Sequence, residues 1–129
     1  MSSMQERFPA IRVTMLPKET NAYGTIFGGV ILSYIDLAGG IEVMRHHSER
    51  FVTKAMREVD FVAPVFLGDL VTFYTRTTRI GTTSICVDVE VEVERLGPNG
   101  NREIVKVTEA QVVYVAIDST GLPTAIKTK

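Results

Sequence analysis

The most regular pattern in the chain runs from residue 84 to residue 95, where apolar and polar side chains alternate with a period of two. The apolar set is Ile85, Val87, Val89, Val91 and Val93, and the polar set is Cys86, Asp88, Glu90, Glu92 and Glu94. Successive side chains of a β-strand point to opposite faces, so the pattern predicts a strand with one buried face. We expect the acidic set to form a solvated or intersubunit sheet face, whose like charges disfavour edge-to-edge pairing.

Turn residues divide the neighbouring segments into further strands. The predicted strands span about residues 51–63, 70–80, 84–95 and 103–117. Gly68, Gly81 and the Gly-Pro-Asn-Gly run at 97–100 supply the turns between them. Their order predicts an antiparallel meander, and the nearly continuous apolar run at 112–117 places the last strand near the sheet centre. The 17 Val, 10 Ile and 14 Thr residues also favour pleated structure.

One long segment, residues 27–47, departs from this pattern. Its apolar side chains cover nearly every direction around a helix, which predicts a buried helix rather than a surface one. His46 and His47 near its end suit the negative pole of the helix dipole. We therefore expect an α+β fold in which one long central helix is wrapped by a curved antiparallel sheet of about five strands. Residues 1–10 and 121–129 are expected to be frayed ends.

Length and composition narrow the class of protein. A chain of 129 residues suits one domain, and its formal net charge of −1 provides no positive field for nucleic acid. No segment is long and apolar enough for a signal peptide or a membrane span, since polar residues and glycines interrupt residues 26–44. The single cysteine, Cys86, rules out an internal disulfide and a CxxC site. These features fit a cytoplasmic protein.

The most informative residue is Asp36, which lies between Ile35 and Leu37 in the predicted helix. A buried carboxylate is costly unless it is paired or reaches solvent, and no Lys or Arg lies three or four positions away. One interpretation is that Ser33 and Asp36 lie on a narrow solvent-exposed strip of the helix surface. The other, which we favour, is that Asp36 lines a cleft as a general base or nucleophile.

A glycine-containing loop, residues 21–29, leads into this helix. The unpaired N–H groups of a helix start can bind a carbonyl oxygen that becomes negative during a reaction, and Gly28 and Gly29 leave them accessible. Gly28 and Gly29 are equally compatible with close helix–sheet packing, a purely structural role.

The spacing of these features predicts an assembly. Eight residues separate Gly28 from Asp36, roughly 12 Å along a helix, which is too far for both to act on one carbonyl carbon. A second copy with its helix antiparallel would bring its glycines to Asp36. The inference therefore predicts a twofold dimer with two shared sites.

Four segments of the chain together resemble a known family. They are N-A-Y-G-T-I-F-G-G-V-I-L-S-Y-I-D-L-A-G-G-I at 21–41, F-V-A-P-V-F-L-G-D-L-V at 61–71, R-I-G-T-T-S at 79–84, and T-E-A-Q-V-V-Y-V-A-I-D at 108–118. The sequence resembles hotdog-fold acyl-CoA thioesterases of the cytosolic acyl-CoA hydrolase type, over about residues 10–126. The resemblance implies one hotdog domain in residues 1–129.

The resemblance also implies roles for individual residues. Asp36 would be catalytic, Asn21 would join the site of the neighbouring subunit, and Gly28 with Gly29 would polarise the thioester carbonyl. The family implies homodimers whose sheets join, often assembled as hexamers that are trimers of dimers.

A second group of residues is assigned to the coenzyme. In the family, the hairpin matching Gly81, Thr82, Thr83 and Ser84 runs beside the pantetheine and phosphates of coenzyme A, although hairpins use the same residues merely to turn. Three arginines are candidate phosphate partners or, alternatively, solvated charges of the sheet face: Arg57, Arg76 and Arg79.

Other reactive residues receive no catalytic role. His46 and His47 have no carboxylate or cysteine at metal-ligand spacing, so we predict no metal site. Cys86 has no nearby histidine in the sequence, and Glu42 lies about 240° around the helix from Asp36. No cofactor is expected, because a thioester is already an activated acyl group and coenzyme A belongs to the substrate.

The leading functional hypothesis is hydrolysis of acyl-CoA thioesters to a free carboxylic acid and coenzyme A. A non-catalytic acyl-CoA binder or sensor is one alternative, and a hotdog-fold acyl-CoA hydratase is another. A hydratase of this fold typically carries an Asp and His pair at the start of the helix, whereas both histidines here lie at the far end. Whether Asp36 acts as base or nucleophile stays open.

Overall fold

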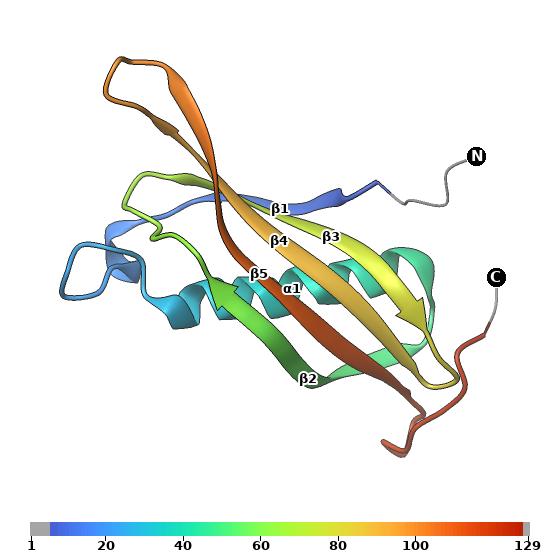
Figure 1. Ribbon diagram of the computed structural model, residues 1–129. Helices are drawn as coiled ribbons and strands as arrows, with labels where there is room; N and C mark the ends of the chain where they lie inside the picture. Colours follow the sequence, from blue (N-terminus) through green and yellow to red (C-terminus); the bar gives the residue numbers. More distant parts are fainter. Residues whose placement is uncertain (1–5, 128–129) are drawn as a thin grey trace.

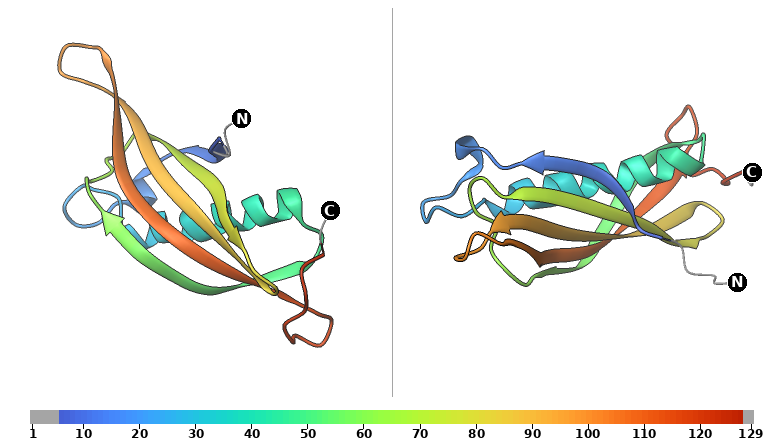
Figure 2. Two further views of the ribbon diagram at one scale, coloured as in Figure 1. Left: turned by 45° about the vertical axis from the view of Figure 1, so that its right-hand side comes forward. Right: turned by 90° about the horizontal axis from the view of Figure 1, so that it is seen from above.

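A computed structural model describes residues 6–127 of the protein as one helix lying against one curved sheet (Figure 1). The elements are β1 (Phe8–Thr14), the 3-10 helix η1 (Pro17–Glu19), α1 (Gly28–His46), β2 (Arg50–Phe61), β3 (Leu70–Ile80), β4 (Ser84–Leu96) and β5 (Arg102–Ile117). Figure 2 shows the five strands curving around α1, which confirms the predicted hotdog architecture. The predicted helix and the four predicted strands match the observed elements within two residues at each end.

The order of the strands differs from the predicted meander. The sheet runs β1-β3-β4-β5-β2, with every neighbouring pair antiparallel. Only β3, β4 and β5 follow the chain order. β2 pairs with β5 at the opposite edge from β1, because the segment after α1 enters beside the last strand. The prediction that β5 is an interior strand is confirmed, with Val112, Val113 and Tyr114 all buried.

Both ends of the chain are more ordered than expected. Phe8–Ala10 belong to β1, which pairs with β3 as an edge strand, a position that tolerates Pro9. At the other end, the Ile126 N–H donates to the Thr82 carbonyl at 2.9 Å and the Ile126 side chain packs against the core. The expectation of frayed ends is therefore wrong for residues 8–10 and 121–127, and its remainder at 1–5 and 128–129 lies outside the described residues.

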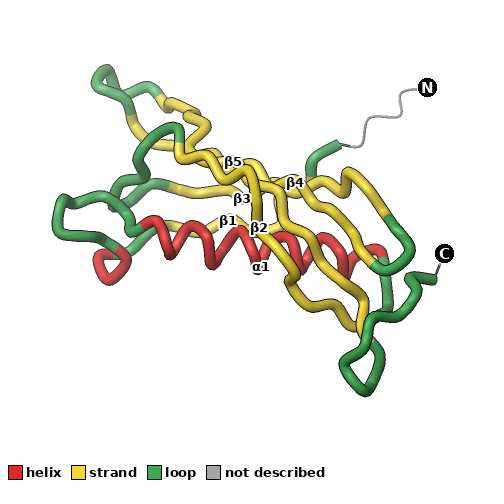
Figure 3. Tube along the Cα trace, turned by 60° about the horizontal axis from the view of Figure 1, so that its bottom comes forward, coloured by secondary structure: helices red, strands yellow, loops and turns green. Residues whose placement is uncertain are grey.

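The core lies between the concave face of the sheet and one side of α1. The five apolar side chains of the alternating strand β4 are all at most 1% exposed, as the period of two predicts. Figure 3 shows α1 lying along the sheet. Opposite the β4 side chains, α1 buries Ile31, Ile35 and Ala38. Area removed from water is the main favourable contribution to folding, so this contact fixes how the helix lies on the sheet.

The other side of α1 is exposed, which corrects the prediction of a helix buried all round. Leu37 is 57% exposed and Met44 is 66% exposed in the single chain. The reason is geometric, since one five-stranded sheet covers only one side of a helix. The apolar residues on the outer side are available to a second surface.

A buried carboxylate fastens α1 to β3. Glu42 is only 2% exposed, and its carboxylate accepts hydrogen bonds from the Thr75 hydroxyl at 2.9 Å and the Thr77 hydroxyl at 2.8 Å. Arg45 donates to it at 3.0 Å, and His46 lies at 3.7 Å. Burial alone would raise the pKa of Glu42, but these hydrogen bonds and positive charges lower it below its ordinary value.

We predict that Glu42→Gln lowers the free energy of unfolding by about 2–3 kcal/mol at pH 7, because buried donors lose a charged acceptor. A lowered carboxyl pKa contributes stability above its unfolded value, near pH 4.3, and loses it as the pH falls through the folded pKa. The difference between wild type and variant should therefore shrink below about pH 4. Urea unfolding at pH 7 and pH 4, at one protein concentration, measures both quantities.

Glu103→Gln, which alters an exposed carboxylate on β5, is the matched control and should change stability little. A Glu42→Gln protein as stable as wild type at pH 7 would show that the cluster contributes nothing.

Candidate active site

The Asp36 side chain is half-buried and borders a cavity of about 370 Å³, hereafter the Asp36 cavity. The walls of the Asp36 cavity include Leu37, Gly40, Val43, Phe51, Thr53 and Tyr114. One carboxylate oxygen, Oδ1, accepts a hydrogen bond from the Thr53 hydroxyl at 2.7 Å and a longer one from the Tyr114 hydroxyl at 3.3 Å. Among residues 6–127, no hydrogen bond reaches Oδ2. Oδ1 is therefore fixed by hydrogen bonds, whereas Oδ2 has no hydrogen-bond partner among these residues.

Strand register explains why Thr53 and Tyr114 meet at this carboxylate. Thr53 on β2 lies directly opposite Tyr114 on β5, and directly opposed residues share one face of a sheet. That face is the one α1 covers. The Tyr114 hydroxyl also donates to the backbone carbonyl of Asp36 at 2.6 Å, which fixes the helix over the two strands.

Gly39 permits the close approach of the Tyr114 hydroxyl to α1. A Cβ atom on Gly39 would lie 2.2 Å from the Tyr114 hydroxyl oxygen, so no larger residue fits without moving Tyr114. A Cβ atom on the next residue, Gly40, would have no neighbour within 4 Å, and Gly40 lines the Asp36 cavity. Burial raises the pKa of Tyr114, and the charge of Asp36 raises it further. The hydroxyl therefore stays protonated and donates.

The start of α1 borders a second cavity of about 280 Å³, hereafter the helix-start cavity. Its walls include Thr25, Ile26, Gly28, Ile31, Phe61 and Thr108. The N-cap residue is Phe27, which makes no side-chain cap, so the first-turn N–H groups of Gly28 and Gly29 have no capping acceptor. Gly28 and Asp36, two parts of the predicted site, thus border different cavities of one chain, and Gly29 lines neither.

Asn21 organises the loop before the helix. Its side-chain oxygen accepts from the N–H groups of Tyr23 at 2.8 Å and Thr25 at 3.2 Å, and its amide donates to the Thr25 hydroxyl at 2.8 Å. Thr25 in turn borders the helix-start cavity. Asn21 lines neither cavity in one chain, and its predicted role in a neighbouring subunit stays a prediction.

The residues predicted to bind coenzyme A fall into two places. Residues 81–84 form the tight β3–β4 turn (Figure 1), in which the Gly81 N–H donates to the Ser84 carbonyl at 2.7 Å. The Thr82 carbonyl accepts from the Ile126 N–H of the C-terminal segment, and the Thr83 carbonyl accepts from the Ala116 N–H of β5. Arg79 is exposed just before this turn. Arg57 lies opposite Gln111, on the outer face of the sheet. Contact with coenzyme A stays a prediction for all of them.

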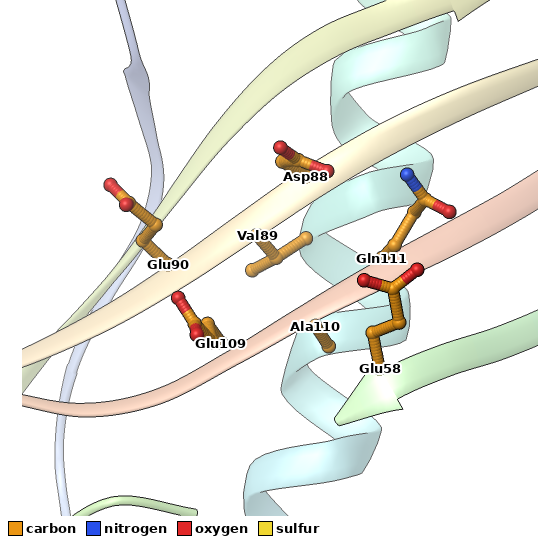
Figure 4. Close-up of a pocket in the computed structure, with 7 residues that line it drawn as sticks. All are labelled: Glu58, Asp88, Val89, Glu90, Glu109, Ala110 and Gln111. Atoms are coloured by element: carbon orange, nitrogen blue, oxygen red, sulfur yellow. The ribbon is translucent and has the colours of Figure 1, made fainter. Parts of the chain in front are cut away.

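The outer face carries a shallow acidic hollow of about 240 Å³ (Figure 4). Figure 4 shows the carboxylates of Asp88, Glu90 and Glu109 on the side of the sheet away from the helix. Arg76 approaches Asp88 at 3.5 Å, and Lys106 pairs with both glutamates. Arg76 thus lies on the outer sheet face beside Asp88, and contact with the phosphates stays a prediction. The acidic side chains of this hollow therefore form ion pairs with basic neighbours. They lie on the outer sheet face, where the alternating pattern of residues 84–95 predicts polar side chains.

Residues 6–127 show neither a metal-ligand cluster nor a membrane-spanning helix. No group of three or more His, Cys, Asp or Glu side chains there could hold a metal ion. No helix in the same range is long and apolar enough to cross a membrane.

Comparison with known proteins agrees with this geometry. Residues 23–97 match the model of a family described as the thioesterase superfamily. The chain belongs to the thioesterase superfamily. The acyl-CoA thioester hydrolase YciA of Salmonella typhimurium is 38% identical over 88% of this chain and 85% of its own. The crystal structure of Cj0915, a hexameric hotdog fold thioesterase of Campylobacter jejuni, has a TM-score of 0.87, 41% identity, and covers 92% of this chain and 90% of its own.

A third superfamily member bears on individual residues. The acyl-CoA hydrolase of Staphylococcus aureus has been crystallised as two alanine variants, one of an aspartate and one of a threonine seventeen positions later. Both structures have a TM-score of 0.78 and 26% identity, and cover 90% of this chain and 69% or 70% of their own. Asp36 and Thr53 have the same separation in this chain.

We predict that Gly39→Ala destabilises the protein by about 1–3 kcal/mol, because the added methyl must displace Tyr114. Gly40→Ala is the matched control on the same helix turn and should be neutral or stabilising by up to about 1 kcal/mol, since alanine favours helix and meets open space. Thermal unfolding of both variants measures the difference. Equal stability of the two would contradict the close approach of Tyr114 to α1.

Proposed function

We propose that this protein hydrolyses acyl-CoA thioesters to a free acid and coenzyme A. The observation that carries the proposal is the Asp36 carboxylate, which lines a cavity and is held through Oδ1, while Oδ2 has no hydrogen-bond partner among residues 6–127. Membership of the thioesterase superfamily and the named activities of the Salmonella and Staphylococcus relatives support the same reaction. The shared spacing of the aspartate and the threonine supports roles for Asp36 and Thr53 in particular.

Two chemical routes are compatible with this carboxylate. Oδ2 can remove a proton from a water molecule that attacks the thioester, or it can attack the carbonyl carbon directly to give an acyl anhydride. In both routes Thr53 and Tyr114 fix the orientation of the carboxylate. Repeated turnover in ¹⁸O-labelled water separates the routes, because only hydrolysis through an anhydride places label in the Asp36 side chain.

The site is completed by a second subunit in this proposal. The Gly28 and Gly29 N–H groups lie roughly 12 Å from Asp36 along α1, so those of an antiparallel partner helix would bind the thioester oxygen. Leu37 and Met44 are exposed on α1, and β2 is a free edge of the sheet, so such a partner would cover both. The named hexameric state of the Campylobacter protein supports further assembly into a trimer of dimers.

We expect the reaction to need no metal or other cofactor, because a thioester is already activated toward attack by water. Residues 81–84 and Arg79 are proposed to lie beside the coenzyme A arm. A cytoplasmic location is proposed as well, in keeping with the free thiol of Cys86.

Asp36→Asn should retain the fold and lower the rate of thiol release from acyl-CoA roughly 10²–10⁴-fold, because the amide can neither accept the water proton nor attack. A thiol-reactive dye and a panel of acyl-CoAs measure the rate. Asp60→Asn is the matched control, since Asp60 is exposed and lies opposite Glu109 on the outer face of the sheet. A wild-type protein that binds the panel but releases no thiol would establish a binder instead of an enzyme.

Gly28→Pro tests the helix start, because proline removes one N–H donor but is well tolerated at the first position of a helix. The preceding residue, Phe27, has φ −61° and ψ 130°, a conformation that suits a residue before proline. We predict a rate about 10²–10³-fold lower, the usual effect of losing one oxyanion donor. Thiol release under saturating acyl-CoA is the measurement.

Gly28→Ala keeps the N–H group, and its Cβ would meet Phe61 at an ordinary 3.6 Å, so it should retain most activity. Mixing the Gly28→Pro and Asp36→Asn proteins, with subunit exchange, should restore about a quarter of the wild-type rate, because half the dimers are mixed and one of their two sites is intact. No recovery in demonstrably mixed dimers would exclude a shared site.

A further inference from the structure

The Asp36 cavity continues past the carboxylate toward the end of α1. Asp36 and Met44, which both line it, are roughly 12 Å apart along the helix. Apart from Asp36, charged side chains enter the lining only at Glu49 and Arg50, which follow the end of the helix. Apolar side chains form most of the remaining wall: Leu37, Val43, Met44 and Phe51. The cavity therefore offers an apolar passage that begins at the candidate catalytic group.

Gly40 is the residue of this wall that has no side chain. A Cβ atom placed on it would have no neighbour within 4 Å, whereas one on the adjacent Gly39 would collide with Tyr114. Gly40 has an ordinary helical backbone, and glycine within a helix is less stable than alanine. Neither the backbone nor the packing of the single chain therefore requires glycine at position 40. What the missing side chain provides is space in the Asp36 cavity.

The position of Gly40 along the helix makes this space important. Gly40 follows Asp36 by four residues and precedes Met44 by four, and residues four apart lie one above the other on the same helix face. A side chain at position 40 would therefore occupy the middle of the passage. The cavity is open in one chain, and the partner proposed to cover Leu37 and Met44 would enclose it.

Resting on the proposed function, we propose that the Asp36 cavity receives the acyl chain and that Gly40 is a specificity-determining residue that sets its length. The cavity of about 370 Å³ holds roughly twelve heavy atoms at about 30 Å³ each, which suits a thioester group with a chain of about ten carbons. The coenzyme arm fits less well, because its amides need hydrogen-bond partners that the apolar side chains along the passage lack.

The experiment measures kcat/KM of the full-length protein for straight-chain acyl-CoAs from butanoyl to tetradecanoyl. For the wild type it should rise about two- to fourfold per methylene up to about ten carbons and then level off. Gly40→Leu fills the space of about four chain carbons, so it should lower the ratio of decanoyl-CoA to butanoyl-CoA about 10- to 100-fold. Gly40→Ala should lower the same ratio only about two- to fourfold.

Ala63→Leu is the matched control, because Ala63 lines the helix-start cavity and not the Asp36 cavity. It should leave the ratio of decanoyl-CoA to butanoyl-CoA unchanged. A ratio that falls in Ala63→Leu but not in Gly40→Leu would place the acyl chain in the helix-start cavity and overturn the proposal. An equal loss for every chain length in Gly40→Leu, with weaker inhibition by free coenzyme A, would assign the Asp36 cavity to the coenzyme arm and overturn it as well.

The assembly of the variants is checked by sedimentation. If Gly40→Leu changed the oligomeric state but not the ratio, Gly40 would serve contact between copies of the chain, and the proposal would be wrong. Should Gly40→Leu fail to fold or assemble, Gly40→Ala provides the same test, and a ratio equal to that of the wild type would overturn the proposal.

A separate measurement distinguishes failure of this proposal from failure of the proposed function. If the wild type released no thiol, the non-hydrolysable thioethers butyl-CoA and decyl-CoA would replace the substrates in calorimetric titration. Tighter binding of decyl-CoA than of butyl-CoA by wild type, with a smaller preference in Gly40→Leu, would support the acyl subsite without hydrolysis. The same preference in both proteins would overturn the role of Gly40.

Discussion

The contact between Tyr114 and the middle of α1 is the constraint on which the site depends. The Tyr114 hydroxyl donates to the backbone and the carboxylate of Asp36, and only a glycine at position 39 lets it come so close. The same contact joins α1 to β5, beside its neighbour β2, where Thr53 completes the support of the carboxylate. One helix–sheet contact therefore sets both the packing of the fold and the orientation of its candidate catalytic group.

A second constraint is the length of the helix. α1 carries a potential oxyanion site at its first turn and a carboxylate two turns later, and the two border separate cavities. The first-turn N–H groups and the Asp36 carboxylate of one helix cannot reach the same substrate atom. A reaction that needs both groups therefore requires a second copy of the chain. The apolar side chains left exposed on the outer side of α1 are consistent with that requirement. Catalysis and assembly then depend on the same surface.

Sequence patterns predicted the parts of this structure that local chemistry decides. The alternation at 85–93, the turn glycines and the apolar helix gave the elements nearly to the residue, and an acid in an apolar helix identified Asp36. The patterns failed where distant segments meet. Neither the pairing of β2 with β5 nor the roles of Thr53 and Tyr114 follow from local periodicity, because residues 36, 53 and 114 come together only through strand register. The short edge strand β1 was missed because Pro9 weakens its pattern.

Buried polar groups in this fold divide according to whether their hydrogen bonds are complete. Glu42 has donors on every side, so its burial holds α1 to β3 and leaves nothing for a ligand. Asp36 is half satisfied, with one oxygen bonded and the other open to a cavity. Thr108 is fully buried, and its hydroxyl has no hydrogen-bond partner among residues 6–127, but that hydroxyl is open to no cavity. Incomplete hydrogen bonding costs stability, so a protein that retains it beside a cavity gains something other than stability from it. By this argument Asp36, which lines a cavity and has an unpaired oxygen, and not the better-bonded Glu42, is the carboxylate available to a ligand.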